Sequence, residues 1–492
     1  MAESLRSAAA LFLITAIAAC APARPEAPTP RFGFVAVADS LILLSDLNAT
    51  HWGVEVYDPA RDRLLYVYNH NRHFIPASNT KIVVSTVALG LLGPDFRYRT
   101  DVFASGMAGD SAVDQVIAVG SGDPTWSDRF YERDDFVLDQ LADSITRGGA
   151  RSIRELIIDA SRFGAERVHS TWEVGDLPGT SAPPVGAFAF AEGVLRISAT
   201  PGSQVGTPAT LTILGPAAFP IRAMVRTDTA GASANLNADY QSWPDTMVIT
   251  GRVGLNRPDT STFAEPNAVR FAATAFAQAL ERKGVRVQSL RVVYDTLEAT
   301  SLRGSAPRVV ATWQSPPLSA IVAGIMQPSQ NWIAEQLVKT LGALHRGRGS
   351  WSSGIDVERR YLIDVVKVDS GAFQLRDASG LSAQNLLTPH SIVQMLRHNL
   401  MQPYGPVFRQ SLPSPGLRGG TLSSRLAGLE GRVFAKTGTI TNVNSLSGYI
   451  VTASGRELIF SIMTNSSGRP SAQVRRGMDR LVSALAEERN WE

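Results

Sequence analysis

The sequence predicts a mixed α/β (α+β) fold, in which an antiparallel sheet flanked by helices is interrupted by a long β-rich insertion. Strand patterns lie near both ends of the 492-residue chain with helical patterns between them, so both ends are expected to meet on one sheet. The middle of the chain instead carries short β-type runs separated by Gly, Pro and Ser. A chain of this length is too long for one simple core and indicates roughly two or three domains.

The N-terminal 20 residues are expected to be an export signal. Arg6 supplies a positive charge, and the apolar run 7–19 is too short for a stable membrane span. Cys20, the only cysteine, directly follows Ile17-Ala18-Ala19, which resembles the lipobox of bacterial lipoproteins, where the cysteine carries the lipid. A stray cysteine beside an ordinary cleavage site is the alternative. Because Asp does not follow Cys20, we expect a periplasmic protein, tethered to the outer membrane by residues 21–31, a stiff Pro-rich segment.

Composition excludes several other classes of function. The formal net charge is only +3 and no block of like charges appears, so nucleic-acid binding has no electrostatic basis. No later apolar run is long enough to span a membrane. A single cysteine allows no intramolecular disulfide. The seven histidines show no metal-ligand spacing, so no metal or other cofactor is predicted.

The first part of the α/β domain is predicted to be a hairpin followed by a helix. Residues 52–58 and 64–69 alternate apolar and polar around a polar turn, as two half-buried strands do. A helical pattern then begins at Ser78 and ends at Gly93-Pro94. We therefore assign residues 32–96 to this domain.

The insertion is predicted over residues 97–308, and the domain resumes over 309–492. One amphipathic helix, 267–283, interrupts the β-type runs of the insertion, which has no repeat period and is expected to form one or two modules. Helical patterns return at 319–328 and 331–345. Three β-type runs follow, with short turns that indicate an antiparallel meander, and a last amphipathic helix covers 471–488.

The first chemical motif is Ser78-Asn79-Thr80-Lys81, where the i, i+3 spacing puts a hydroxyl and an amine on one helix face. A serine hydroxyl needs an adjacent base, and lysine serves as one only when its amine is neutral. Burial and a nearby positive charge such as Lys436 favour that neutral form. Taken alone the motif is expected about once by chance, and a Ser N-cap followed by a solvated Lys is the alternative.

Two further motifs carry groups that complement an activated serine. Ser329-Gln330-Asn331 precedes a helix; its hydroxyl can relay a proton and its amide can orient an amine, although an N-cap pair is the simpler interpretation. Lys436-Thr437-Gly438-Thr439 ends an edge-like strand, where Lys and hydroxyls can bind a carboxylate and Gly admits a close backbone approach. A strand ending in a turn is the alternative for this motif.

Together the three motifs occur in the order, and on the elements, found in serine β-lactamases and penicillin-binding proteins. The chain resembles the penicillin-binding-protein-4 type D-alanyl-D-alanine carboxypeptidases, peptidase family S13, over most of residues 50–465. The similar stretches are IPASNTKIVVSTVALGLLG, GSGDP, MQPSQNWIAEQLVKTLG, DASGLS, GGTLSSRL, AKTGT and SLSGYI. This resemblance implies a serine β-lactamase/transpeptidase-like catalytic domain, and the long gap between the first two motifs matches the family's nested insertions.

The resemblance also implies a role for each motif residue. Ser78 would attack the carbonyl of the penultimate D-Ala and Lys81 would accept its proton, while Ser329 and Asn331 complete the relay. Lys436, with the Thr437-Gly438-Thr439 segment, would hold the terminal carboxylate or its β-lactam equivalent. Backbone N–H groups of Ser78 and Thr439 would form the oxyanion hole of an acyl-enzyme that water then hydrolyses. The implied partners are peptidoglycan stem peptides, β-lactam antibiotics and, through the lipid on Cys20, a membrane.

Two further motifs that contain an Asp are expected to be structural: Asp377, Gly380 and Ser382 of DASGLS form a self-capped turn, and Asp123 of GSGDP is first a turn residue. In the resembled family an acidic residue near an aromatic can bind the diaminopimelate amine. Trp172-Glu173 with Asp176 lies in about the right region, but Thr-Ser-Ala-Pro-Pro stands where the family usually has Tyr.

Three classes of function remain after this comparison of motifs. The favoured one is a DD-carboxypeptidase or DD-endopeptidase. The second is a related acyl-serine hydrolase: an esterase, D-aminopeptidase or β-lactamase. The third is a non-catalytic penicillin-binding scaffold. The intact motifs argue against the scaffold, and the long insertion argues against a β-lactamase.

Overall fold

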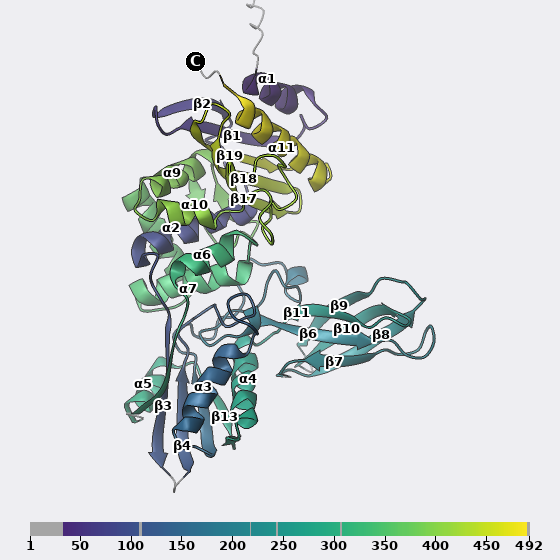
Figure 1. Ribbon diagram of the computed structural model, residues 1–492, viewed down its shortest axis with the longest axis vertical. Helices are drawn as coiled ribbons and strands as arrows, with labels where there is room; N and C mark the ends of the chain where they lie inside the picture. The colour runs from purple at the N-terminus through teal and green to yellow at the C-terminus, as the bar shows by residue number, and fades with distance from the viewer. Residues whose placement is uncertain (1–32, 108–110, 217, 243–244, 306–307, 490–492) are drawn as a thin grey trace, which may run out of the picture.

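The computed structural model describes residues 33–107, 111–216, 218–242, 245–305 and 308–489. The predicted signal peptide, Cys20 and the Pro-rich segment 21–31 lie outside the described residues. Figure 1 shows an elongated molecule with the two ends of the described chain at one pole, the insertion at the other, and a narrow arm projecting sideways. Within the described ranges, no helix has both the length and the apolar character needed to cross a membrane.

A five-stranded antiparallel sheet forms the centre of the first domain. Its order is β17 (Val433–Ile440), β18 (Val443–Val451), β19 (Glu457–Asn465), β1 (His51–Asp58) and β2 (Arg63–Tyr68). β1 pairs with β19 in a register that sets Val54 opposite Ile462. The predicted hairpin, the predicted meander and the meeting of both chain ends on one sheet are therefore confirmed.

Helices cover both faces of this sheet (Figure 1). On one face α1 and α11 share a core with the strands, and on the other face lie α2 and its neighbours. The helices of the domain are α1 (Phe34–Asp39), α2 (Lys81–Leu92), α6 (Leu318–Met326), α7 (Asn331–Arg346), α8 (Trp351–Tyr361), α9 (Pro389–Leu400), α10 (Gly405–Ser411) and α11 (Ser471–Glu487). Every residue of α2 from Lys81 to Leu89 is buried, as expected for a helix apolar on all sides. This central helix carries the first motif.

Short helical turns and one small hairpin complete the domain and its junctions. 3-10 turns lie at Ala77–Thr80, Val174–Asp176 and Ala191–Gly193, π-type turns at Ser40–Leu44 and Leu362–Val366, and β15 (Phe373–Gln374) pairs with β16 (Leu386–Leu387).

The insertion has a mixed sheet of its own, covered on both faces by helices. The strands are β12 (Arg286–Val287), β5 (Ser152–Asp159), β4 (Ala112–Val119), β3 (Arg99–Met107) and β14 (Arg308–Gln314), with β13 (Leu290–Val293) also paired to β5. The packed helices are α3 (Phe136–Arg147), α4 (Ala268–Arg282) and α5 (Thr296–Ser305). The predicted helix 267–283 corresponds to α4, capped by Asn267, whereas α3 and α5 were not predicted.

β14 extends the inserted sheet beyond the predicted boundary between residues 308 and 309. It pairs with β3 over Arg308–Gln314, so its backbone hydrogen bonds belong to the insertion. The chain therefore returns to the first domain after β14, near Ser315, whose backbone N–H donates to Tyr98.

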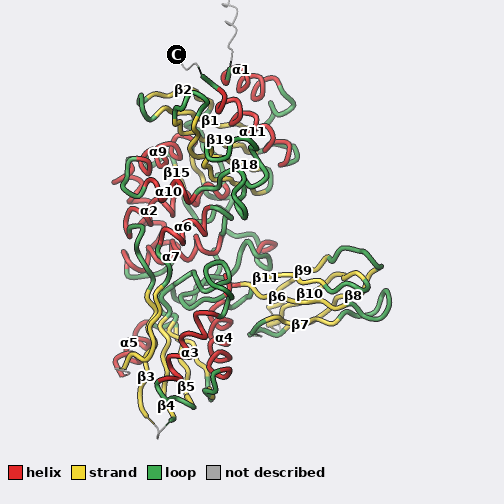
Figure 2. Tube along the Cα trace, viewed as in Figure 1, coloured by secondary structure: helices red, strands yellow, loops and turns green. Residues whose placement is uncertain are grey.

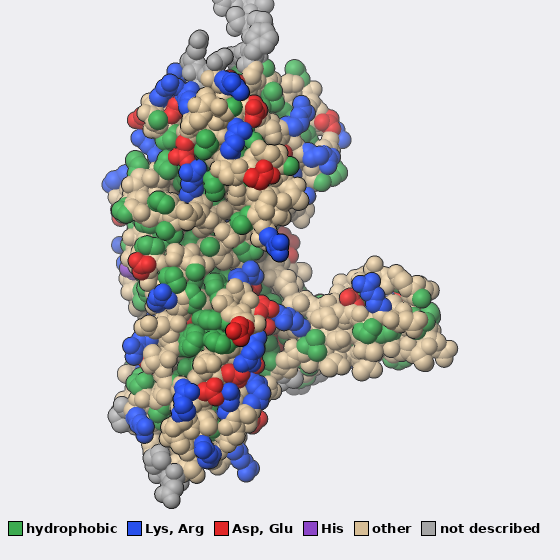
Figure 3. Space-filling view, in the orientation of Figure 1, with side chains coloured by type: hydrophobic (Ala, Val, Ile, Leu, Met, Phe, Trp, Pro, Cys, Tyr) green, Lys and Arg blue, Asp and Glu red, His purple; other side chains and the backbone are tan. Residues whose placement is uncertain are grey.

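The arm is built of two small three-stranded sheets joined by loops (Figure 2). They consist of β8 (Ile221–Asp228), β10 (Asp245–Gly254) and β9 (Asn235–Ser242), and of β11 (Asp259–Ala264), β6 (Val194–Thr200) and β7 (Thr210–Leu214). The surface is hollowed between this arm and the first domain (Figure 3).

Candidate active site

The three motifs meet where α2, the start of α7 and β17 come together. The Nζ of Lys81 lies 2.9 Å from Ser78 Oγ and 2.6 Å from Asn331 Oδ1. The Nζ of Lys436 lies 2.8 Å from Ser329 Oγ. Ser78 and Ser329 are half-buried, whereas both lysines are fully buried. Residues more than 100 positions apart in the sequence thus form one polar cluster that opens to solvent through its two serines.

Ser78 is presented by a tight turn rather than by the helix itself. It lies in the 3-10 turn Ala77–Thr80, and the α-helix proper begins only at Lys81. In a 3-10 turn, side chains at i and i+3 eclipse one another, which aligns Ser78 Oγ with Lys81 Nζ. The preceding Ala77 has φ +46°, a conformation that costs a non-glycine residue free energy and must be imposed by its surroundings.

Gly380 and Gly438 allow two segments to approach this turn closely. Gly380 has φ +80°, and a Cβ placed on it would lie 1.8 Å from the carbonyl oxygen of Ala77. A Cβ on Gly438 of β17 would lie 2.8 Å from the carbonyl oxygen of Pro76 and 3.0 Å from the backbone nitrogen of Ser78. Neither contact leaves room for a side chain, so both positions require glycine.

The second motif places its hydroxyl and its amide on different sides of the cluster. Ser329 has φ +67° and directs its Oγ to Lys436, while Asn331, the first residue of α7, accepts from Lys81 through Oδ1. The Nδ2 of Asn331 donates to the carbonyl of Ser181 at 2.8 Å. This second bond fixes which end of the amide faces the lysine, and it ties the site to the insertion.

The third motif lies on β17, an edge strand of the central sheet whose residues are mostly buried. Lys436 points inward and also donates to the Thr437 carbonyl at 2.9 Å. Thr437 Oγ1 donates to Thr421 Oγ1 at 2.7 Å. Thr439 is solvent-exposed, and its Oγ1 donates to the Gly438 carbonyl. One ammonium and two hydroxyls along an edge strand can bind a carboxylate whose own backbone runs beside that strand.

Burial dominates the electrostatics of Lys81. It lowers the pKa of the Lys81 amine to about 7, against the opposing charges of Glu335 and Asp377. The charge of Lys436 is not among the causes of this shift; instead burial first, and then the charge of Lys81, lower the pKa of Lys436. Two fully buried amines this close to one another disfavour a state in which both are protonated.

Three oxygens surround the amine of Lys81, which can donate to all three as an ammonium and to two of them as a neutral amine. A neutral amine has two N–H donors and one lone pair. Asn331 Oδ1 and the Ser379 carbonyl, at 2.6 Å and 2.7 Å, take the two donors. The lone pair then faces Ser78 Oγ at 2.9 Å, the orientation needed to accept its proton.

Two residues that support the site, Glu335 and Ser379, were not predicted. Glu335, one helical turn after Asn331 on α7, is fully buried and accepts the backbone N–H of Ser379 at 2.7 Å. Burial raises the pKa of the Glu335 carboxyl to about 7. Since Ser379 offers its carbonyl to Lys81, Glu335 positions an acceptor of the catalytic amine. Its i+4 spacing from Asn331 was the available signal, because that spacing places both residues on one helix face.

Asp377, Gly380 and Ser382 of the DASGLS segment have the structural role predicted for them. Asp377 is buried and accepts the backbone N–H groups of Gly380 and Ser382, at 2.9 Å and 2.7 Å. Asp123 likewise accepts the backbone N–H of Thr125, two residues on. Both carboxylates close their own turns.

The region considered for an amine-binding pocket is arranged differently. Trp172 is buried and donates its indole N–H to Asp377, whereas Glu173 is exposed and Asp176 half-buried on the following turn. A small hollow of about 230 Å³ beside the second motif has other lining residues: Arg129, Thr180, Ser181, Pro328, Ser329, Gln330 and Asn331.

A larger cleft of about 810 Å³ passes over Ser78 and along β17. Its far wall comes from α11, which contributes Arg475, Arg476 and Asp479, and from Arg425. Arg425 pairs with Asp479 at 2.7 Å. Among the residues that the structure describes, no carboxylate forms an ion pair with Arg475 or Arg476, so these two supply the uncompensated positive charge of this wall. The remaining lining residues are Ser329, Thr421, Ser424, Leu426, Ala427, Thr437, Gly438, Thr439 and Ala472.

Comparison with known proteins identifies relatives over nearly the whole chain. Residues 35–485 match the D-Ala-D-Ala carboxypeptidase 3 (S13) family. A D-alanyl-D-alanine carboxypeptidase of Actinomadura sp. (strain R39) is 33% identical over 456 residues, covering 88% of this chain and 81% of the relative. The crystal structure of penicillin binding protein 4 from Haemophilus influenzae superposes with a TM-score of 0.77 at 21% identity, covering 92% and 99% of the two chains. A second structure of that protein, complexed with a novel β-lactam, has a TM-score of 0.72 at 21% identity and the same coverage.

Proposed function

The chain belongs to the D-Ala-D-Ala carboxypeptidase 3 (S13) family, and on that premise we propose how its residues carry out a serine DD-peptidase reaction. The enzyme is a serine-type D-Ala-D-Ala peptidase, and its substrates are peptidoglycan stem peptides. One observation carries the proposal: the Nζ of Lys81 faces two fixed acceptors and the Ser78 hydroxyl at the same time.

Acylation begins with the neutral amine of Lys81. It takes the proton of Ser78 as Oγ attacks the carbonyl carbon of the penultimate D-Ala. Oδ1 of Asn331 holds the amine throughout, so no reorganisation is needed when its positive charge forms. The backbone N–H groups of Ser78 and Thr439 stabilise the developing oxyanion. The close approach of Gly438 to the Ser78 backbone supports this part of the proposal.

Collapse of the tetrahedral intermediate requires a proton on the leaving amine. Ser329 is suited to deliver it, because its Oγ already accepts from Lys436 at 2.8 Å and keeps its own proton free to donate. Lys81 then reprotonates Ser329. Water enters along the same route and hydrolyses the ester, which returns Ser78 to its starting state.

Lys436 and the hydroxyls of Thr437 and Thr439 bind the terminal carboxylate of the substrate. An arriving carboxylate stabilises the ammonium form of Lys436, which burial alone disfavours. The same subsite takes the carboxylate of a β-lactam, and Ser78 then opens the lactam ring to a stable ester. The β-lactam complex of the Haemophilus influenzae relative supports this part of the proposal.

The shape of the cleft favours a second activity at the same site, which is endopeptidase cleavage of D-Ala–diaminopimelate cross-links. The cleft continues beyond the carboxylate subsite to Arg475 and Arg476 on α11, which leaves room for a leaving group larger than D-Ala. A cross-linked leaving group is a peptide with further carboxylates, which the two arginines complement.

The decisive experiment is mass spectrometry of products from purified muropeptides, with Ser78→Ala as the control. Release of free D-Ala from pentapeptides indicates carboxypeptidase activity, and conversion of cross-linked dimers to monomers indicates endopeptidase activity. If Ser78→Ala still takes up labelled penicillin covalently, the assignment of the nucleophile is wrong.

We also propose that the protein is exported to the periplasm and tethered to the outer membrane by a lipid on Cys20. The unique cysteine at the end of the apolar run 7–19 and the Pro-rich segment 21–31 support this proposal. Cys20→Ser is expected to release the protein from membrane fractions, and unchanged retention would refute the lipid anchor.

A further inference from the structure

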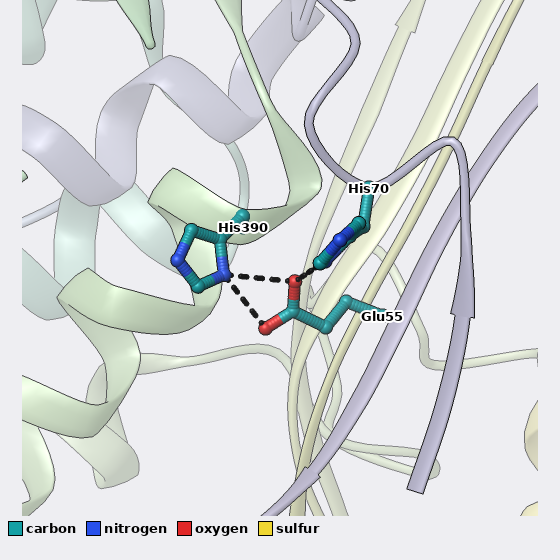
Figure 4. A group of neighbouring side chains, drawn as sticks. All are labelled: Glu55, His70 and His390. Carbon is teal, nitrogen blue, oxygen red and sulfur yellow. Dashed lines mark hydrogen bonds and ion pairs between the residues drawn. The ribbon is translucent and has the colours of Figure 1, made fainter. Parts of the chain in front are cut away.

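Glu55, His70 and His390 form a compact cluster outside the catalytic motifs (Figure 4). The Nδ1 of His70 lies 2.7 Å from Glu55 Oε2, and the Nδ1 of His390 lies 3.0 Å from the same oxygen and 3.1 Å from Oε1. Glu55 comes from β1, His70 from the loop after β2, and His390 from the first turn of α9. The histidines have no ligand spacing in the sequence, and only the fold brings them together.

The carboxylate of this cluster is buried without a permanent cation. The Glu55 side chain is 1% exposed, whereas those of His70 and His390 are 22% and 37% exposed. Across the described ranges, no Lys or Arg pairs with Glu55; both of its oxygens face the two imidazoles. A buried carboxylate needs a partner that compensates its lost hydration. Because the rings are partly exposed, a dissolved ion can reach the point where the three side chains converge.

We propose that Glu55, His70 and His390 bind one divalent transition-metal ion, zinc being the best match, with water at the fourth position. Two imidazole nitrogens and one carboxylate oxygen are a common zinc ligand set, and imidazole disfavours magnesium and calcium. At zinc–ligand distances of about 2.0–2.1 Å, neighbouring donors of a tetrahedron lie about 3.3–3.4 Å apart. Here the Nδ1–oxygen separations are 2.7 Å and 3.0 Å, so each nitrogen needs to move away from the Glu55 oxygen by only a few tenths of an ångström. The ligand atoms of all three residues lie within 4.8 Å of one another.

The backbone holds the ligands in place before any ion arrives. The N–H of His390 donates to the carbonyl of His70 at 3.0 Å, which fixes the two histidines relative to each other. Asn69 turns the chain with φ +47° and donates to the Trp52 carbonyl at 3.0 Å. Glu55 is held in register between β2 and β19. Such prior ordering reduces the entropy lost on binding.

Asn71, the residue after His70, can fix the orientation of the His70 ring. The amide of Asn71 contacts His70 Nε2 at 3.1 Å, on the side of the ring away from Glu55. A metal ion bound at Nδ1 of His70 leaves the ring proton on Nε2. If the Asn71 amide is rotated by about 180°, its Oδ1 accepts a hydrogen bond from this N–H. An outer partner of this kind fixes the tautomer and orientation of a metal-bound imidazole.

The site would act as a structural clasp and does not depend on the proposed function. It joins β1, α9 and the segment from His70 that leads to Ser78, in which Phe74 pairs with Leu387 just before α9. We therefore expect zinc to raise thermal stability, while the rate of acylation by penicillin changes little.

Zinc titration of the chelator-treated full chain, followed by calorimetry and by thermal unfolding, tests the proposal. One zinc ion per chain is expected, with an affinity at least about tenfold weaker in His70→Gln and in His390→Gln. Both side chains are partly exposed, so these variants are expected to fold. The matched control is His73→Gln, an exposed histidine in the same segment, which should bind zinc like the unmodified protein.

Cobalt serves as a spectroscopic probe of the same site. A visible spectrum of tetrahedral Co²⁺ is expected in the unmodified protein and in His73→Gln, and its loss in His390→Gln. Absence of stoichiometric zinc binding, or equal affinity in His390→Gln and the unmodified chain, would overturn the proposal. In that case the cluster is only a hydrogen-bonded clasp between a carboxylate and two imidazoles.

Discussion

Acylation of Ser78 is expected to depend on pH through the proton of Lys81. The perturbation is a change of pH from 8 to 5, which protonates the amine that must accept the serine proton. Burial lowers the pKa of Lys81 to about 7. The neutral fraction is then about 0.9 at pH 8 and about 0.01 at pH 5, a fall of about 90-fold.

The alkaline limb of the profile separates this explanation from that of an ordinary lysine. With a pKa near 7, the neutral fraction rises only about 1.1-fold between pH 8 and pH 10. With the unperturbed pKa of 10.5, it would rise about 75-fold over the same range. The two cases therefore differ most where few other groups of the site titrate.

The assay is the second-order rate constant for covalent labelling by a fluorescent penicillin, measured from pH 5 to pH 10 and quenched by denaturation. Covalent labelling reports acylation alone and is independent of deacylation. A plateau above about pH 8 with a fall below pH 7 supports a neutral Lys81. A rate that keeps climbing beyond pH 9, or one that stays flat down to pH 5, refutes the reasoning.

Four substitutions test other parts of the structure. Asn331→Ala removes the acceptor 2.6 Å from Lys81 Nζ and should slow acylation about 100-fold with little change in melting temperature; a loss below threefold would contradict the role of Asn331. Lys436→Met should lower kcat/KM about 100-fold for peptides ending in a free carboxylate but much less for the matching C-terminal amides, and equal losses would argue against carboxylate recognition. Glu358 is fully buried, neither of its oxygens has a hydrogen-bond partner among the described residues, and burial raises its pKa well above 4.5. The unfolded chain therefore loses this proton first, and stability falls as the pH rises above about 4.5. Glu358→Met should remove that fall and stabilise the protein by about 1–3 kcal/mol at pH 8 in urea unfolding, whereas destabilisation would contradict the argument. Gly380→Ala should cost about 1–3 kcal/mol and also slow acylation, because the added Cβ would strike the Ala77 carbonyl; unchanged labelling would show that the Ser78 turn does not depend on this contact.

Elements with strong local patterns could be predicted from the sequence. The alternation in 52–68 predicted the hairpin of β1 and β2, and the three runs after residue 430 predicted the meander β17–β18–β19. The apolar period of 267–283 predicted α4. In each case the residues that form the buried face of an element lie close together in the sequence, so a local pattern is sufficient to predict the element.

Other features were not predicted because the residues that determine them are distant in the sequence. α3 buries Val137, Leu141 and Ile145 at helical spacing, but β-type runs lie on both sides of it in the sequence and favoured a prediction of strands for the whole region. β14 (Arg308–Gln314) crosses the predicted boundary, and only its pairing with β3 assigns the whole strand to the insertion. The pairing of strands separated by some 200 residues leaves little local signal.

The sequence by itself determined which chemical groups this protein uses: a serine and a lysine three residues apart, a second hydroxyl–amide pair, and a strand lysine with threonines. Tertiary structure alone decided the state of those groups. Burial of Lys81 sets its protonation, and the distant Asn331 and Ser379 direct its lone pair at Ser78. The same holds for Glu55, His70 and His390, which share a site only because β1, the loop after β2 and α9 pack together. Residue types are local properties of a chain, whereas desolvation and hydrogen-bond geometry depend on every segment that packs around them.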